Sequence, residues 1–161
     1  MAYNNNNYNR QDDKSESKPA VEIKSFYEAG SKNLQKDLFD KTALDVAESF
    51  VGKDNKGKTV GVSSTQLRRI FDEVKRFERL INDDNSFSAQ LPYIKMIKSK
   101  VAYNVARAVK KKSSEKDVYM NLEKFLFSCI DCVKAEKDYH VFVALFEAVY
   151  GFYYEKAPKE N

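Results

Sequence analysis

Apolar residues recur at intervals of three and four along most of this chain, and this spacing constrains the fold more than any other feature. The clearest stretch begins at Ser63 and carries one apolar stripe formed by Leu67, Ile70, Phe71, Val74, Phe77 and Ile81. Such a stripe is typical of a helix that buries one side. Nowhere does a two-residue alternation persist long enough to predict a sheet. We therefore expect an all-α fold, a five-helix bundle with a disordered N-terminal tail.

Local signals predict where the best-marked helix begins and ends. Ser63 can cap its N-terminus, with Gln66 completing a capping box, while Val62 and Leu67 stand where a hydrophobic staple belongs. The helix is expected to end at residues 82–85, where four polar residues follow one another.

The later helices carry weaker boundary signals. Pro92, a residue favoured in the first helical turn, predicts the start of the next helix, which runs to about Lys112. Ser114 and Asp117 indicate a cap for the helix after it. The last helix, from roughly residue 139 to residue 155, is apolar on almost all sides, which predicts that it is buried centrally or covered by a partner.

The length of 161 residues suits one domain with an optional tail. Residues 1–20 are polar and rich in asparagine, so they offer too little apolar surface to order, and we expect a disordered tail there. Residues 21–157 are predicted to form a single helical domain, in which the helical pattern begins at Ser31. Residues 52–61, with three glycines and three lysines, are expected to be a loop.

Composition excludes several classes of protein. With 42% hydrophobic and 32% charged residues and only five glycines, the chain is neither collagen-like nor fully disordered. No apolar run approaches the ~18 residues that a membrane span needs, and the chain does not open on a signal peptide, so we expect no membrane association. Two cysteines are too few for a disulfide scaffold, which favours a cytoplasmic location.

Residues 52–59 match the G-x-x-x-x-G-K-T pattern of a phosphate-binding P-loop. That loop requires a buried strand before it and a helix that begins at its Lys-Thr end. Here the preceding segment has a helical pattern, and residues 60–62 separate the loop from the next cap. A basic mobile loop is therefore the preferred interpretation, and a P-loop nucleotide-binding enzyme is the least favoured alternative.

No group of side chains predicts catalysis or metal binding. Cys129 and Cys132 form a Cys-x-x-Cys pair inside a predicted helix, with no second pair to complete four metal ligands, so they are interpreted as core residues. His140 is the only histidine, and nothing near it resembles the nucleophile elbow of a serine triad. We expect no enzymatic activity, no metal and no cofactor.

Basic residues are distributed unevenly along the chain. Residues 85–114 contain seven lysines and arginines and no carboxylate, although the net charge of the whole chain is only +4. Thirty residues without an acid create a positive field, which is the pattern expected for a polyanionic partner.

The candidate RNA-binding residues lie opposite the apolar stripes of two consecutive helices. In the first helix one acid, Asp72, lies among the basic residues. In the second helix Lys100, Tyr103, Arg107 and Lys110 follow one another at i, i+3, i+7 and i+10, and Lys95 lies on the flank of this side. Lysine and arginine hold phosphate oxygens, and tyrosine can stack on an unpaired base or bond to a 2′-hydroxyl. The alternative is a solvated surface with ion pairs between turns. The candidates are Arg68, Arg69, Lys75, Arg76, Arg79, Lys95, Lys100, Tyr103, Arg107 and Lys110.

Three short segments resemble the small subunit of the type III-A CRISPR effector, the Csm-type complex. They are SSTQLRRIFDEV at 63–74, KVAYNVAR at 100–107 and LFEAVY at 145–150. Their order and spacing in a small helical protein carry the resemblance, which extends over residues 60–155. Five of the candidate residues fall within these segments: Arg68, Arg69, Lys100, Tyr103 and Arg107.

The resemblance implies a non-catalytic subunit of an antiviral ribonucleoprotein. Copies of it would be repeated along the inner side of a filament and line the channel that holds guide RNA paired to target RNA. Its partners would be those RNAs, the backbone and large subunits of the complex, and other copies of itself. A helical protein–protein adaptor, whose basic surfaces meet an acidic protein, is the alternative from another functional class.

Overall fold

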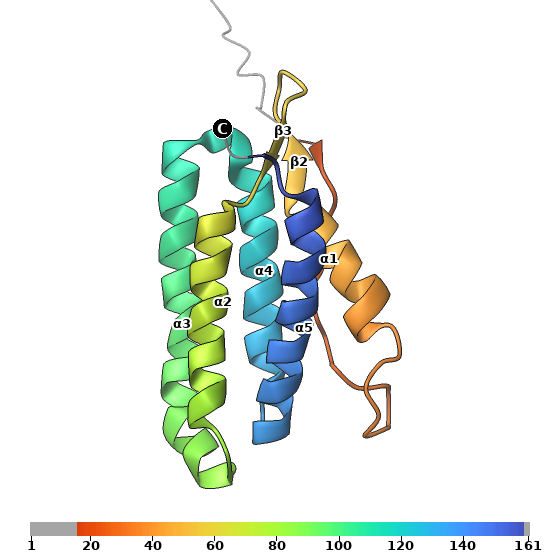
Figure 1. Ribbon diagram of the computed structural model, residues 1–161, viewed down its shortest axis with the longest axis vertical. Helices are drawn as coiled ribbons and strands as arrows, with labels where there is room; N and C mark the ends of the chain where they lie inside the picture. Colours follow the sequence, from red (N-terminus) through yellow and green to blue (C-terminus); the bar gives the residue numbers. More distant parts are fainter. Residues whose placement is uncertain (1–15, 160–161) are drawn as a thin grey trace, which may run out of the picture.

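The computed structural model describes residues 16–159 and shows the expected helical bundle (Figure 1). In Figure 1 α2 and α3 run side by side in opposite directions, α4 and α5 lie next to them, and α1 lies beyond α5. The prediction of an all-α fold with five helices is confirmed, and the structure adds a small three-stranded sheet. Their bounds are α1 Ala43–Ser49, α2 Ser64–Leu80, α3 Asp84–Lys111, α4 Lys116–Cys132 and α5 Glu136–Lys156.

Residues 52–61, which were expected to be a loop, instead form most of a β-hairpin in a small sheet. Strands β2 (Val51–Lys53) and β3 (Thr59–Gly61) pair antiparallel, and β1 (Glu16–Ser17) pairs with β2, which gives the order β1-β2-β3. The strands contain two or three residues each, so they are too short to show the alternation by which sequence periodicity identifies a sheet.

Turn chemistry stabilises the β2–β3 hairpin. The Asp54 side chain accepts hydrogen bonds from the backbone N–H groups of Lys56 and Lys58, both at 2.9 Å. Gly57 has φ +74°, a left-handed conformation that glycine adopts without a steric penalty. The hairpin is therefore closed by two features of its turn: the hydrogen bonds that Asp54 accepts, and the left-handed glycine three residues later.

The expected disordered tail, residues 1–20, falls mostly outside the described residues. Within the described part, the boundary at residue 20 is wrong, because Glu16–Ser17 already pair with β2. The Asn121 side chain of α4 then donates a hydrogen bond of 2.9 Å to the backbone oxygen of Lys18. Residues 16–20 are thus part of the folded domain.

Helix α3 begins at Asp84, eight residues before Pro92, where the sequence had predicted its start. Asp83 and Ser86 form a capping box: the Ser86 N–H donates to Asp83 Oδ1 at 2.7 Å, and the Ser86 hydroxyl accepts from the Asp83 N–H at 3.0 Å. Pro92 is tolerated inside the helix on its exposed side. The capping box, which satisfies two orphan N–H groups, determines the start of the helix more strongly than the proline does.

The other helix starts follow the sequence less closely. Ser63 caps α2 as expected, its hydroxyl accepting from the Gln66 N–H at 3.4 Å, but the Gln66 Oε1 atom is buried without a partner among the described residues, so the capping box is incomplete. Before α4 a 3₁₀ turn ends at Glu115, which occupies the cap position without a side-chain bond, one residue after the expected cap residue Ser114.

The helical pattern expected from Ser31 produces an α-helix only from Ala43. Tyr27 and Leu34 pair in an isolated β-bridge, and a single π-helical turn, Leu38–Thr42, leads into α1. The spacing of Leu38 and Val46 reflects burial of both side chains in the core, and not one continuous helix.

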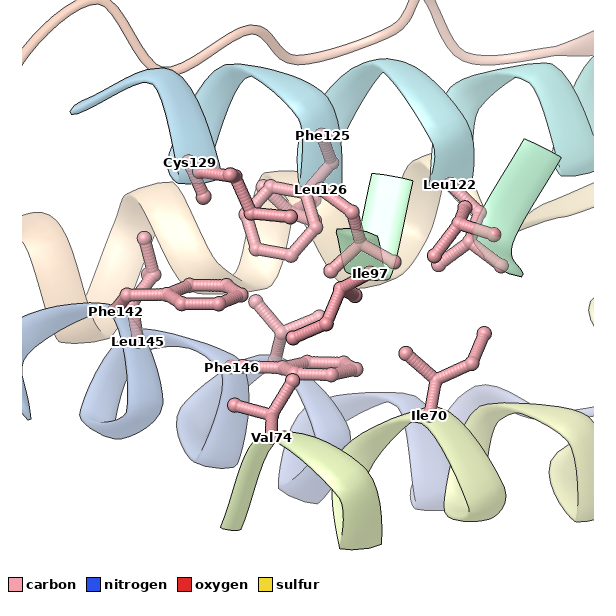
Figure 2. Packing of buried hydrophobic residues seen from close by; sticks show 14 of the residues in the cluster. Ile70, Val74, Ile97, Leu122, Phe125, Leu126, Cys129, Phe142, Leu145 and Phe146 are labelled. Carbon is pink, nitrogen blue, oxygen red and sulfur yellow. The ribbon is translucent and has the colours of Figure 1, made fainter. Parts of the chain in front are cut away.

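The core lies between the inward sides of α2, α3, α4 and α5. Figure 2 shows the side chains that meet there, including Val74 from α2, Ile97 from α3, Cys129 from α4 and Phe146 from α5. Helix α5 packs against α1, α2 and α4, which accounts for its apolar sequence. Its remaining exposed side carries Ala144, Glu147, Gly151 and Tyr154. Within residues 16–159, none of the helices has the length and apolarity needed to cross a membrane.

Candidate nucleic-acid interface

Helices α2 and α3 form an antiparallel pair, and the outward surface along their line of contact is called here the α2–α3 seam. Arg69 and Glu73 of α2, together with Lys100 and Asn104 of α3, line a narrow cleft of about 100 Å³ at this seam. The apolar floor of the cleft is made by Ile70, Ile97 and Val101, which belong to the core. Burial of the two apolar stripes therefore brings the polar residues beside them together.

One carboxylate lies between two of the predicted cations. Glu73 forms ion pairs with the Lys100 ammonium of α3 and, at 3.7 Å, with Nη2 of Arg76 one turn along α2. All three side chains are partly exposed, so solvent screens both pairs and each contributes little to stability. Lys100 and Arg76 both lie at the seam, but their charge is partly compensated by Glu73.

Two of the predicted α2 cations face the other way, toward α5. Arg68 Nε lies 3.0 Å from Oδ1 of Asp72, and this carboxylate, followed by the Tyr150 hydroxyl of α5, raises the pKa of Arg68. Lys75 pairs with Glu78 at 3.6 Å. Arg68 and Lys75 therefore form ion pairs with acids one turn away on the same helix. This matches the alternative interpretation of the helix, a solvated surface with ion pairs between turns.

Five predicted cations form no ion pair within the described residues, and all five are exposed: Arg69, Arg79, Lys95, Arg107 and Lys110. Helix geometry at about 100° per residue separates two of them from the seam. Arg79 lies within about 20° of Arg68 around α2, on the side that faces α5. Lys95 lies about 60° from Lys98 around α3, toward α4, whereas Lys110 lies within about 20° of Tyr103. Lys98, nearer the α4 side, pairs with Asp131 of α4.

The structure therefore brings six of the ten predicted residues to one surface and separates four. The six at the seam are Arg69, Arg76, Lys100, Tyr103, Arg107 and Lys110, and the four elsewhere are Arg68, Lys75, Arg79 and Lys95. Tyr103 is 65% exposed, so its ring is open to solvent between Lys100 and Arg107.

Sequence reasoning missed three residues of the seam. Glu73 was not expected to compensate cations of α3, since its partner Lys100 is 27 positions away in the chain. Tyr93 and Met96, both exposed, precede Tyr103 by ten and seven residues on the same side of α3. The spacing that selected Lys100 and Arg107 would have selected Tyr93 and Met96 as well.

A larger hollow of about 710 Å³ lies where the N-terminal end of α2 and the C-terminal end of α3 meet the β2–β3 hairpin. Lys58, Lys111, Lys112 and Lys159 line it, opposed by Asp54 and Glu115, and Lys112 pairs with Glu115 at 3.4 Å. The residues that match the P-loop pattern form the hairpin beside this hollow. A P-loop leads from a strand into a helix, whereas this segment leads from β2 into β3.

The Cys-x-x-Cys pair lies in α4, and burial raises the pKa of both thiols. Cys129 is fully buried, and the Cys132 thiol donates to the backbone oxygen of Ile23 at 3.3 Å. A reactive cysteine needs a lowered pKa, so both thiols have the opposite property. Residues 16–159 contain no cluster of three or more histidine, cysteine or carboxylate side chains that could hold a metal ion.

Comparison with known protein families identifies one match. The family model described as Csm2 Type III-A matches residues 34–158, a range that includes all five helices and the hairpin, and with them the whole seam. No curated protein and no solved structure matches the chain. Because the match extends over most of the sequence, the chain belongs to the type III-A Csm2 family, the small subunit of the type III-A CRISPR effector, the Csm complex.

Proposed function

We propose that this protein binds the sugar–phosphate backbone of RNA through the α2–α3 seam, without regard to base sequence and without catalysing a reaction. One observation carries the proposal. Arg69, Arg107 and Lys110 are exposed at the seam, and no carboxylate in the described part of the chain pairs with them. Cations held together on rigid helices and left without acids match the repeating negative charge of a phosphate backbone.

The expected mechanism is counterion release. Each lysine or arginine that neutralises a phosphate displaces a condensed cation, which gives the logarithm of the affinity a slope of about −0.7 per contact against the logarithm of salt concentration for a single strand. If only Arg69, Arg107 and Lys110 bind, the slope is about −2. If Arg76 and Lys100 exchange Glu73 for phosphates as well, it becomes about −3.5.

The partners that we propose for this protein are those expected for a small subunit of the Csm complex. The RNAs are the guide and target strands, and the protein contacts are those with the backbone and large subunits and with other copies of the same chain, in the cytoplasm. One seam offers few phosphate contacts, so a single copy binds weakly. Several copies arrayed along one strand gain affinity because each bound neighbour raises the effective concentration of the next.

Two arginine substitutions at the seam test the proposal. Arg107→Ala and Arg69→Ala are each expected to weaken binding several-fold for single-stranded RNAs of unrelated sequence and to reduce the salt slope by about 0.7. Filter binding across a salt series measures both quantities. Arg79→Ala and Lys95→Ala are matched controls, since both side chains are exposed cations away from the seam. Circular dichroism establishes that each variant is folded.

The outcomes separate the two functional classes. If Arg107→Ala and Arg69→Ala leave the binding isotherm unchanged, the seam does not bind RNA phosphates. If the unmodified protein binds no RNA even at low salt, the helical adaptor with an acidic protein partner becomes the better explanation. Duplex RNA and DNA probes in the same series measure whether the backbone contact distinguishes between nucleic acids.

A further inference from the structure

Helix α3 exposes large apolar side chains as well as cations along the seam. The exposed fractions are 54% for Tyr93, 45% for Met96 and 65% for Tyr103. These are three of the six large hydrophobic residues that are exposed in residues 16–159, the others being Phe39, Leu80 and Tyr154. Scattered apolar residues on a surface are ordinary, whereas several on one side of one helix indicate a binding surface.

The three side chains share one side of α3 with the seam cations. Tyr93, Met96 and Tyr103 stand at positions i, i+3 and i+10, and Lys100 and Arg107 at i+7 and i+14. At about 100° per residue, all five fall within an arc of about 80°. The helix therefore presents a single stripe in which positive charges are interspersed among aromatic and apolar side chains.

We infer that the RNA bound at the seam presents unpaired bases, and that Tyr93 and Tyr103 stack against them while Met96 makes an apolar contact between the two rings. The inference rests on the proposed function and names the form of its ligand. A single strand displays apolar base surfaces and negative phosphates side by side, and the α3 stripe displays apolar rings and positive charges that complement both. No carboxylate in residues 85–114 opposes the approach of the phosphates.

The exposure of the rings argues against a continuous duplex as the ligand. In a paired helix both surfaces of an interior base are covered by its neighbours, so an added ring has nothing to stack on. The two tyrosines are ten residues apart, or about 15 Å along the helix axis. Since stacked bases follow one another at about 3.4 Å, the rings engage bases that are several nucleotides apart. A strand must therefore be long enough to reach both rings.

A strand without bases tests this inference directly. The probes are a ten-nucleotide oligouridylate, an abasic ribose–phosphate oligomer of the same length and a ten-base-pair RNA duplex, each titrated with the full chain. We expect the unmodified protein to bind the oligouridylate about tenfold or more tightly than the abasic strand, since each stacked base contributes to affinity. Tyr103→Leu and Tyr93→Leu are expected to reduce this preference and to leave abasic binding unchanged.

The controls separate stacking from phosphate binding and from protein contacts. Tyr154→Leu, at an 80% exposed tyrosine on α5, should retain the preference of the unmodified protein. Arg107→Ala should weaken binding of the base-containing and abasic strands equally. If the oligouridylate and abasic strands bind equally well, stacking is wrong while backbone binding stands. If neither strand binds, both proposals fail. If Tyr93→Leu changes only the sedimentation coefficient, the stripe is a protein interface and the inference is wrong.

Discussion

The Glu73 carboxylate of α2 forms an ion pair with the Lys100 ammonium of α3 across the seam, and the same carboxylate lies 3.7 Å from Nη2 of Arg76. It is the only acid among the residues that line the cleft between the two helices. One negative charge shared by two cations leaves the group with a net charge of +1. Glu73 therefore weakens the positive field at the place where Lys100 and Arg76 would meet phosphates.

Glu73→Gln is expected to strengthen RNA binding. The substitution keeps the size of the side chain and removes the charge, so Lys100 and Arg76 become available to phosphates. We expect the affinity for single-stranded RNA to rise several-fold at low salt and the salt slope to steepen by about 0.7 to 1.4. Filter binding at several salt concentrations measures both effects.

A matched substitution on another helix controls for net charge. Glu147→Gln makes the same chemical change on the exposed side of α5, away from the seam. A similar gain in both variants would mean that overall charge, and not release of Lys100 and Arg76, controls affinity. Because exposed ion pairs contribute little to folding, neither variant should change the thermal midpoint appreciably.

The apolar spacing of the sequence predicted the bundle because burial of one side of a helix is a local property. Ser63 was recognised as a cap for the same reason, since its partner is three residues away. The run of residues without acids at 85–114 also identified α3 as a helix with exposed cations, and the spacing of Lys100, Tyr103 and Arg107 identified the side that carries them. These features depend on neighbours in the chain, and the sequence alone contains them.

The parts that could not be predicted depend on contacts between distant residues or on very short elements. The ion pair between Glu73 and Lys100 joins two helices whose rotation about their axes is set by core packing. Arg68 and Lys75 are separated from the seam because they lie on the side of α2 that faces α5. A helical wheel of α2 alone does not show where α5 packs. The β2–β3 hairpin was not predicted because its strands are too short to show the two-residue alternation of a β-strand.

Asp83→Asn is expected to reduce the loss of stability in acid. Hydrogen bonds from Ser86, through its backbone N–H and its hydroxyl, hold the pKa of Asp83 below its usual value. A lowered pKa in the folded state contributes stability that is complete above the unfolded value, near 4, and is lost as pH falls through the folded value. Asparagine is an equally good cap and cannot be protonated in this range.

Thermal midpoints of the two proteins at pH 6 and at pH 3 check this prediction. The midpoints should be similar at pH 6, and the acid-induced decrease should be smaller in the variant. Ser86→Ala, which removes the reciprocal hydroxyl of the capping box, should lower the midpoint at both pH values. An identical acid-induced decrease in Asp83→Asn and the unmodified protein would show that Asp83 does not contribute to acid sensitivity.

Two glycine substitutions are expected to have opposite effects. A Cβ atom at Gly61 would lie 2.7 Å from the Tyr153 hydroxyl and 3.1 Å from the Phe50 carbonyl oxygen, so Gly61→Ala should destabilise the protein by about 1–3 kcal/mol. At Gly151, inside α5, a Cβ meets nothing within 4 Å, and alanine should stabilise by about 0.5–1 kcal/mol. Urea unfolding measures both changes. A Gly61→Ala variant as stable as the unmodified protein would contradict the close contacts at Gly61, and a destabilised Gly151→Ala variant would contradict the open space at Gly151.

Tyr139→Phe is expected to destabilise the protein at neutral pH and to make it less sensitive to alkali. The buried Tyr139 hydroxyl donates a hydrogen bond of 2.7 Å to the Val74 backbone oxygen, which links α5 to α2. Loss of this bond should lower the free energy of unfolding by about 1 kcal/mol at pH 7. Burial is the main cause that raises the pKa of Tyr139, with smaller contributions from the carboxylates of Glu78 and Glu73.

The sign of the alkaline effect follows from this raised pKa. Stability from Tyr139 is complete below the unfolded pKa, near 10, and is lost as pH rises toward the folded value. The difference between the two proteins should therefore shrink between pH 7 and pH 11, as measured by urea unfolding. Tyr27, whose pKa is raised to about 12 by burial and by its hydrogen bond to Asp138, titrates in both proteins and cancels in the comparison. Tyr154→Phe, at an exposed site, should behave as the unmodified protein does. A difference that stays constant up to pH 11 would mean that Tyr139 has the same pKa in the folded and unfolded states, which would contradict the pKa raised by burial.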